Sequence, residues 1–163
     1  MAEDNEPQSQ PVVEPPRGMH NGRLDDKGRL KLPVQFQAYL NSFSEKKLFV
    51  TSTDRRTAQI YPISVWRQNE KLLHEFRQLP KVARKVAFNA NDLGADADMD
   101  SQGRVLFNPE LRRALDMENH GLRLYCFKGH IQVLTEAVYQ AQLKDAEEDA
   151  VENVYTMEEF GLQ

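Results

Sequence analysis

The sequence has little of what most enzymes and membrane proteins require. Its 163 residues include one cysteine, Cys126, which excludes an intramolecular disulfide framework and a zinc site built on several cysteines. No stretch approaches the roughly 20 consecutive apolar residues that a membrane-spanning helix needs. The acidic, proline-rich residues 1–16 contain no apolar run, so they do not resemble a secretory signal. We therefore expect a soluble, cytoplasmic protein.

Catalytic and metal-binding motifs are also missing. The histidines form no i, i+4 pair and have no neighbouring metal ligand at standard spacing: His20, His74, His120 and His130. No glycine-rich phosphate loop occurs, and Cys126 lies in an alternating strand pattern typical of a buried small apolar residue. A run of aspartates comes nearest to a cation site: Asp92, Asp96, Asp98 and Asp100. An EF-hand loop that began at Asp96 would need glycine and glutamate where the sequence has Ser101 and Phe107. We predict no catalysis, no metal and no cofactor, and a hydrolase using the aspartate run is the least favoured hypothesis.

Charge is unevenly distributed, although the formal net charge is only −4. Residues 1–16 carry four acids and no base, and residues 144–163 have a net charge of −6. Residues 17–143 hold 20 lysines and arginines against 14 acids. A basic middle segment favours a polyanionic partner, while acidic ends that only improve solubility would give the same distribution.

The chain contains an internal repeat. LDDKGRLKLPVQF, residues 24–36, aligns with MDSQGRVLFNPEL, residues 99–111, at an offset of 75, and QIYPISVW, residues 59–66, aligns with QVLTEAVY, residues 132–139. A period this long indicates two copies of one supersecondary unit rather than a solenoid.

Each copy predicts the same elements. A glycine turn leads into a short alternating strand (29–32 or 104–107), followed by a short helix, and Asn108 is a good N-cap for the second of these. Two further strands are expected in each copy, at 47–53 with 57–61 and at 122–127 with 130–134, and a helix follows near Ser64 or after Thr135. Apolar stripes predict inter-repeat helices that end before Pro80 and by Gly94. The acidic segment after Gln142 is either a docking segment or frayed.

Basic residues cluster in and before the first alternating strand. Because side chains alternate along a strand, Arg29 and Lys31 share one face while Leu30 and Leu32 share the other, so the bases should face solvent. Arg17, Arg23 and Lys27 precede them and would extend this basic ridge towards DNA phosphates or guanine edges. An ordinary charged strand face explains the same pattern. A second cluster is typical of a solvated helix face: Arg77, Lys81, Arg84 and Lys85.

The motif Asp-x-x-Gly-Arg occurs once in each copy. Gly28 and Gly103 would permit a tight turn, and Asp25 and Asp100 would shape it. The aspartate can accept backbone N–H bonds from the turn or pair with the arginine four residues later. Either arrangement orients the arginine, which suits DNA binding, although an internal salt link alone would satisfy the same pattern.

These segments resemble the MraZ family, bacterial regulators with two fused SpoVT-AbrB-type domains. RG-x5-LDDKGRLKLP (residues 17–33), YPISVW (61–66) and MDSQGRVLFNPELRRAL (99–115) resemble that family's segments in order and spacing, over residues 17–142. The resemblance implies an α+β fold with a mainly β core: a swapped-hairpin, AbrB-like double-split β-barrel built from two repeats with connecting helices. It divides the chain into a disordered extension (1–16), a first repeat (17–76), an inter-repeat helix (77–94), a second repeat (95–142) and an acidic tail (143–163).

The resemblance also implies a function. It is transcriptional regulation of the division and cell-wall gene cluster by a ring-shaped homo-oligomer at the nucleoid, bound to direct repeats of a short G-rich box in double-stranded DNA. Carried over by position, the DNA-binding residues are Arg17, Arg23, Lys27, Arg29, Lys31 and, in the second repeat, Arg104. Because Gln102 stands where the first repeat has Lys27, we expect the first motif to dominate.

One alternative comes from a different class of protein. An antitoxin-like or scaffold relative would use the acidic tail, residues 143–163, to bind another protein. The two hypotheses differ in whether that tail or Arg29 is needed for the partner.

Overall fold

The structure is a computed structural model that describes residues 13–163. The expectation of disorder in residues 1–16 therefore falls largely outside the described residues. In chain order the elements are β1 (His20–Arg23), β2 (Arg29–Lys31), α1 (Val34–Asn41), β3 (Leu48–Thr51), β4 (Ala58–Pro62), α2 (Ile63–Glu75), α3 (Pro80–Leu93), β5 (Ala95–Ala97), β6 (Arg104–Leu106), α4 (Pro109–Ala114), β7 (Gly121–Phe127), β8 (His130–Thr135), α5 (Glu136–Glu147) and α6 (Ala150–Glu159). Within this part of the chain, each helix is too short or too polar to cross a membrane.

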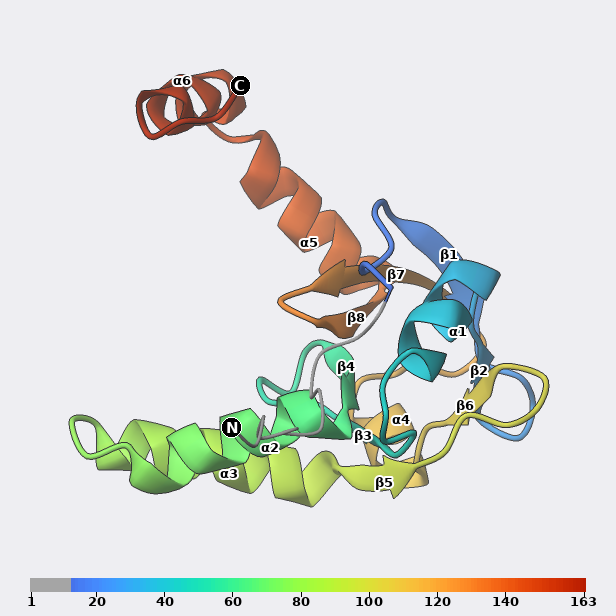
Figure 1. Cartoon of the computed structure of the whole chain (residues 1–163). Coiled ribbons are helices and arrows are strands. Elements are labelled where there is room, and N and C mark those ends of the chain that lie inside the picture. The colour runs from blue at the N-terminus through green and yellow to red at the C-terminus, as the bar shows by residue number, and fades with distance from the viewer. Residues whose placement is uncertain (1–12) are drawn as a thin grey trace, which may run out of the picture.

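The fold is α+β, as expected, and consists of two antiparallel sheets with helices around them. The larger sheet has the order β1-β7-β8-β4-β3-β5, and the smaller is the ribbon β2-β6 (Figure 1). Each sheet mixes strands from both repeats. The first strand of each repeat pairs with the hairpin of the other, since β1 pairs with β7 and β5 pairs with β3.

The register gives the two repeats a local two-fold relation. In the ribbon, Leu30 lies opposite Val105, and in the large sheet Gln59 lies opposite Gln132. Both are pairs of residues that the internal alignment matches with each other. When equivalent residues of two antiparallel strands face each other, a two-fold axis must pass between them, so the two copies enclose one shared core.

That core lies between the ribbon, the short helices and the large sheet. Its members are buried in equivalent pairs from the two repeats: Leu30 with Val105, Leu32 with Phe107, and Phe36 with Leu111. Because apolar residues alternate along β2 and β6, one face of the ribbon enters the core and the other remains exposed. The amino-acid pattern thus fixes which ribbon face solvent can reach.

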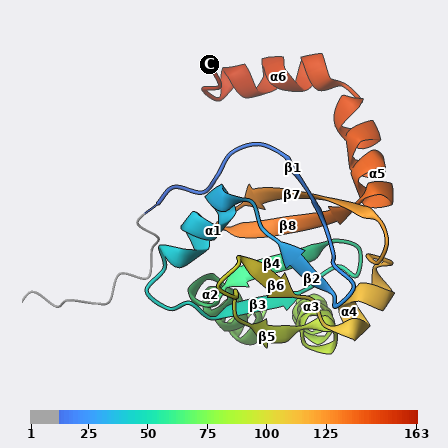
Figure 2. The same ribbon diagram turned by 90° about the vertical axis from the view of Figure 1, so that its right-hand side faces the viewer.

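Helices α2 and α3 form a hairpin beside the β3-β5 edge of the large sheet, to the left of these strands in Figure 1 and level with them in Figure 2. Trp66 of α2 packs against Phe49 and Tyr61 at ring distances of 4.8 and 4.9 Å, and Thr51 donates a hydrogen bond to the carbonyl of Ala90 in α3. The two apolar stripes had predicted these helices within a residue or two.

Local capping signals also have the predicted effect. The Asn108 side chain accepts a hydrogen bond from the Leu111 N–H at 2.8 Å, and Pro109 occupies the first helical turn, where its missing N–H leaves no intrahelical bond unmade. Thr135 caps α5 through the N–H of Val138.

Three elements differ from the sequence expectation. Strands β1 and β5 were not predicted, because HNGR and ADA carry no alternating apolar pattern and become strands only by pairing with the other repeat. The segment after Gln142 is helical rather than frayed: α5 continues to Glu147 and α6 follows, although neither helix has a buried residue.

The buried His130 predicts a pH dependence of stability. Its ring stacks on Tyr61 at 4.4 Å, and burial lowers the pKa of the imidazole from its ordinary 6.5 to about 4. The unfolded chain therefore binds a proton at a pH where the native protein does not. We expect the free energy of unfolding to decrease as the pH falls from about 6.5 to about 4. Urea unfolding at a series of pH values measures this slope.

Two variants test this assignment. His130→Gln should flatten the dependence of the free energy of unfolding on pH in this range. The control is His74→Gln, which makes the same substitution at an exposed position and should leave that dependence unchanged. A wild-type slope that survives in His130→Gln would show that another group causes it.

Candidate nucleic-acid interface

The turn before β2 is organised by a single carboxylate. Oδ1 of Asp25 accepts hydrogen bonds from the backbone N–H groups of Lys27 at 3.0 Å and Arg29 at 2.9 Å, and Oδ2 accepts from Nε of Arg29 at 2.8 Å. Gly28 closes the turn with φ of 80°, a left-handed conformation that favours glycine. The two roles that the sequence left open for the aspartate therefore occur together.

The turn before β6 repeats this arrangement. Oδ1 of Asp100 accepts from the N–H groups of Gln102 and Arg104, and Oδ2 accepts from Nε of Arg104, with distances of 2.9, 2.9 and 2.8 Å. Gly103 has φ of 76°. The internal repeat in the sequence thus appears as a repeat of hydrogen bonds.

Electrostatics favour the ionised form of both carboxylates. The backbone N–H of Arg29 lowers the pKa of Asp25, and its guanidinium and the N–H of Lys27 add to that effect, while partial burial opposes it. The same groups act in the same order on Asp100, with Arg104 and Gln102 as donors. Each arginine is held through Nε, which leaves the outer guanidinium nitrogens free of the carboxylate.

Each of the two turns also accepts a hydrogen bond from the other repeat. The N–H of Phe107 donates to the carbonyl of Gly28, and the N–H of Leu32 donates to that of Gly103, both at 2.9 Å. Each turn therefore lies against the residue that follows the other repeat's ribbon strand. The ribbon and its turns form one hydrogen-bonded unit.

Each turn glycine is covered by a side chain of the other repeat. The carboxamide of Gln37 lies over Gly103 and donates to the carbonyl of Leu32 at 2.7 Å, while the guanidinium of Arg112 lies over Gly28. A Cβ on either glycine would come within 2.4 Å of the covering group. Gln37 and Arg112 are equivalent in the internal alignment, so the coverage is reciprocal.

Arg112 is a residue that the sequence analysis missed. Its side chain is only 14% exposed, Nη1 donates to Glu118 at 2.8 Å, and Nε is the one buried side-chain nitrogen or oxygen without a hydrogen bond among residues 13–163. Its match with Gln37 at the offset of 75 was a signal, but that match could not reveal contact with the glycine of the other turn.

The exposed face of the ribbon is basic. In the β2-β6 register Lys31 lies opposite Arg104 and Arg29 lies opposite Leu106. Residues opposite each other in an antiparallel pair share a face, so three cations and one apolar side chain lie together on it. We call this set the ribbon face: Arg29, Lys31, Arg104 and Leu106. As the sequence predicted, Leu30 is buried while Lys31 is exposed.

The other residues predicted to contact DNA lie outside the ribbon face. Lys27 is exposed in the first turn, beside Arg29. Arg23 ends β1 and donates to the carbonyl of Asn119 at 3.5 Å. Arg17 lies beyond the other end of β1, pairs with Glu14 at 3.1 Å and lines a hollow with the β7-β8 hairpin turn at Lys128. The structure thus groups four predicted cations and places Arg17 apart from them.

The cysteine and the aspartates that the sequence offered as candidates for catalysis or metal binding have other environments or contacts in the structure. Burial raises the pKa of the Cys126 thiol to about 11, which makes it a poor nucleophile at neutral pH. Asp100 organises its turn, and Asp96 lies 3.6 Å from the amine of Lys47. In the described part of the chain, no group of three His, Cys, Asp or Glu side chains could hold a metal ion.

Comparison with known proteins was made for the whole chain. No family model matches it. It is similar to a transcriptional regulator MraZ of Acidobacterium capsulatum, with 29% identity over 146 residues, which cover 90% of this chain and 99% of that protein. The MraZ of Koribacter versatilis is 35% identical over 63% of this chain and 70% of its own length. The MraZ of a Polaromonas species is 31% identical over 77% of this chain and 86% of its own length.

The covered glycine turn predicts a local stability effect. In Gly103→Ala the new Cβ would displace Gln37 from its hydrogen bond, and the residue would keep an unfavourable φ. We expect the free energy of unfolding to fall by about 1–2 kcal/mol. Gly121→Ala is the control, because a Cβ there meets no atom within 4 Å. Equal effects of the two substitutions in urea unfolding would contradict this account of the turn.

Proposed function

The chain belongs to the MraZ family of transcriptional regulators, and from that membership we propose that it binds double-stranded DNA through the ribbon face. The observation that carries the proposal is the grouping of Arg29, Lys31 and Arg104 on one face of a two-stranded ribbon, with Lys27 exposed in the turn before it. A β-ribbon fits the major groove of B-DNA. The family consists of regulators rather than enzymes, and we assign no catalytic step, cofactor or small-molecule substrate.

The hydrogen bonds of the turns support distinct roles for these cations. Arg29 and Arg104 are held through Nε by their aspartates, so their guanidinium groups project in set directions at no further conformational cost on binding. Oriented guanidinium groups suit bidentate contacts to guanine, whereas the exposed Lys27 and Lys31, which make no ion pair in the described structure, suit phosphate contacts. Arg23 at the end of β1 and Arg17 before its start lie outside the ribbon face and would extend the contact only along the DNA backbone. In this proposal Asp25, Gly28, Asp100 and Gly103 shape the turns and do not touch DNA.

We assign the fold to the swapped-hairpin, AbrB-like double-split barrel. The exchange of β1 and β5 between the two repeats supports this assignment, as does the cross-repeat ribbon β2-β6. The two repeats are residues 17–76 and 95–142, joined by residues 77–94 and followed by the acidic segment 143–163.

The target and the assembly follow from family membership. We propose that the protein acts in the cytoplasm, at the nucleoid, on direct repeats of a short G-rich box upstream of the division and cell-wall gene cluster. One ribbon face offers few cations, so a single copy should bind DNA modestly. A ring-shaped homo-oligomer would present several ribbon faces to successive boxes, and linked sites gain avidity without new contacts.

Arg29→Ala tests the proposed site. It removes one oriented guanidinium, so we expect binding to duplex from upstream of the protein's own gene to weaken about tenfold or more. Because Arg29 is assigned to a guanine, the log–log salt dependence of binding should change by less than the value of about 0.9 that one lost phosphate contact would give. Fluorescence anisotropy at two salt concentrations, with shuffled duplex beside the promoter duplex, measures both effects.

The matched control is Arg56→Ala, which removes an exposed arginine from the β3-β4 turn. It should leave the affinity nearly unchanged. Asp25 keeps its two backbone N–H bonds in Arg29→Ala, so the melting temperature should change little. Equal affinity of wild type and Arg29→Ala for both duplexes would refute the proposed site, and an unfolded variant would show that the Asp25–Arg29 link serves stability alone.

A further inference from the structure

The C-terminal helices form an arm that stands away from the sheets. Helix α5 rises from the end of β8, and α6 lies at its far end (Figures 1 and 2). Neither helix contains a buried residue. Only the base of α5 is anchored, where the guanidinium of Arg123 lies 3.6 Å from the ring of Tyr139 and 3.2 Å from Glu136. The arm is therefore attached through α5, whereas α6 has no buried residue within the described chain.

Helix α6 is amphipathic and acidic. Its apolar side chains recur at helical spacing and are about half exposed or more: Val151, Val154, Tyr155, Met157 and, at its end, Phe160. Residues 148–163 also carry five acids and no base. Among the described residues none of these five acids makes an ion pair with a side chain. An exposed apolar stripe is typical of a helix that packs into an apolar groove, and the unpaired acids beside it would favour a groove bordered by cations.

A groove of the complementary kind lies between α2 and α3. It has a volume of about 660 Å³, and its apolar lining includes Trp66, Leu73, Phe76, Ala83 and Ala87. The small side chains Ala83 and Ala87 on α3 leave room for another helix to approach closely.

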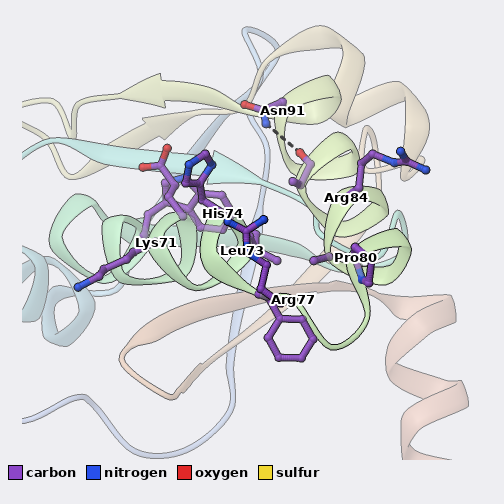
Figure 3. A pocket seen from close by; sticks show the side chains of 12 residues that line it. Lys71, Leu73, His74, Arg77, Pro80, Arg84 and Asn91 are labelled. Carbon is purple, nitrogen blue, oxygen red and sulfur yellow. Dashed lines mark hydrogen bonds between the residues drawn. The ribbon is translucent and has the colours of Figure 1, made fainter.

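Basic side chains border this groove. Lys71, Arg77 and Arg84 line it together with His74 (Figure 3), and Glu70 is its one acidic lining residue. In Figure 3 the charged ends of Lys71 and Arg84 point to opposite sides, away from the groove floor. In the described structure Arg77 and Arg84 make no ion pair. The basic cluster that the sequence showed at residues 77–85 therefore borders an apolar groove rather than a plain helix face.

The arm does not reach the groove of its own chain. Figure 2 places α6 above β7 and the α2-α3 hairpin at the height of β3 and β5, near the opposite edge of the large sheet. Figure 1 shows the same separation. A contact between α6 and this groove therefore requires two chains.

We propose that α6 of one copy docks in the α2-α3 groove of a second copy of this chain. The apolar stripe of α6 would cover the groove, and its acids would face Arg77, Arg84 and Lys71. Because the arm and the groove are different surfaces, the contact is heterologous. Each copy that donates an arm still offers a groove, so the contact continues from copy to copy until it closes into a ring. This inference deepens the proposed ring assembly but needs no DNA.

Charge exchange tests the contact. Glu152 and Glu159 lie two helical turns apart on one flank of α6. We expect Glu152→Arg with Glu159→Arg to raise the dissociation constant of the oligomer about tenfold or more, and Arg77→Glu with Arg84→Glu to do the same. The chain with all four substitutions should recover most of the lost assembly. Light scattering coupled to size-exclusion chromatography, over a range of protein concentrations, gives the mass. The control Glu110→Arg reverses an exposed helical charge on α4 and should not change it.

A disulfide experiment identifies the surfaces. Two differently tagged chains are co-expressed in a Cys126→Ala background, one with Met157→Cys on α6 and the other with Ala87→Cys in the groove. We expect a cross-linked species that contains both tags on a non-reducing gel. The control replaces Ala87→Cys by Val34→Cys, an exposed position on α1, and should give no cross-link.

Three outcomes would overturn the proposal. The first is an oligomer mass that neither pair of charge reversals changes. The second is a cross-link from Met157→Cys to Leu106→Cys instead of Ala87→Cys, which would place the arm on the ribbon face. The third is an oligomer that forms normally without residues 148–163, since these residues bury nothing in their own chain. None of these measurements includes DNA. A chain that assembles as expected but binds no promoter would therefore refute the proposed function alone.

Discussion

The antiparallel pairing of β2 with β6 is the constraint on which the rest of the structure depends. Leu30 lies opposite Val105, its own equivalent in the other repeat, and both are fully buried. A ribbon of three-residue strands is too short to be stable in isolation. It persists because its inner face enters the core while its turns hydrogen-bond to the residues that follow the opposite strands. The exposed basic face is the necessary reverse of that buried face.

The turns show how the Asp-x-x-Gly-Arg motif that stabilises the ribbon also prepares an arginine for the proposed DNA contact. An ionised aspartate accepts two backbone N–H groups and one arginine Nε, so the carboxylate that closes the turn also sets the direction of the guanidinium. An arginine without this link would have to be ordered when it binds DNA, at a cost in side-chain entropy. The internal salt link and the proposed DNA contact are therefore compatible roles of Arg29, because the link uses Nε and leaves the outer nitrogens available.

The sequence predicts the elements whose cause is local. Asn108 marks a helix start, the alternation around Leu30 gives the ribbon faces, and the offset of 75 gives the two-copy construction. It does not predict β1 or Arg112 over Gly28, because both depend on contacts with the other repeat, far along the chain. For α6 the reason is different. The helix buries no residue within its own chain. The sequence therefore shows an acidic segment with scattered apolar residues, and it gives no sign of the α2-α3 groove that we propose as their partner.

The backbones of the two repeats are related by a two-fold axis, but equivalent positions differ in charge. This difference bears on the kind of DNA site that the proposed function requires. Lys27 corresponds to Gln102, Lys31 to Leu106, and Arg112 to Gln37, and Arg112 lies over the first turn rather than the second. Lys27 and Arg29 therefore lie at one end of the ribbon and Lys31 and Arg104 at the other, so the two ends share a backbone but differ in their side chains. A symmetric reader matches a palindromic site, whereas a directional one matches an asymmetric box. Direct repeats of such a box place successive copies head to tail, and a heterologous contact between an arm and a groove orients copies in that way.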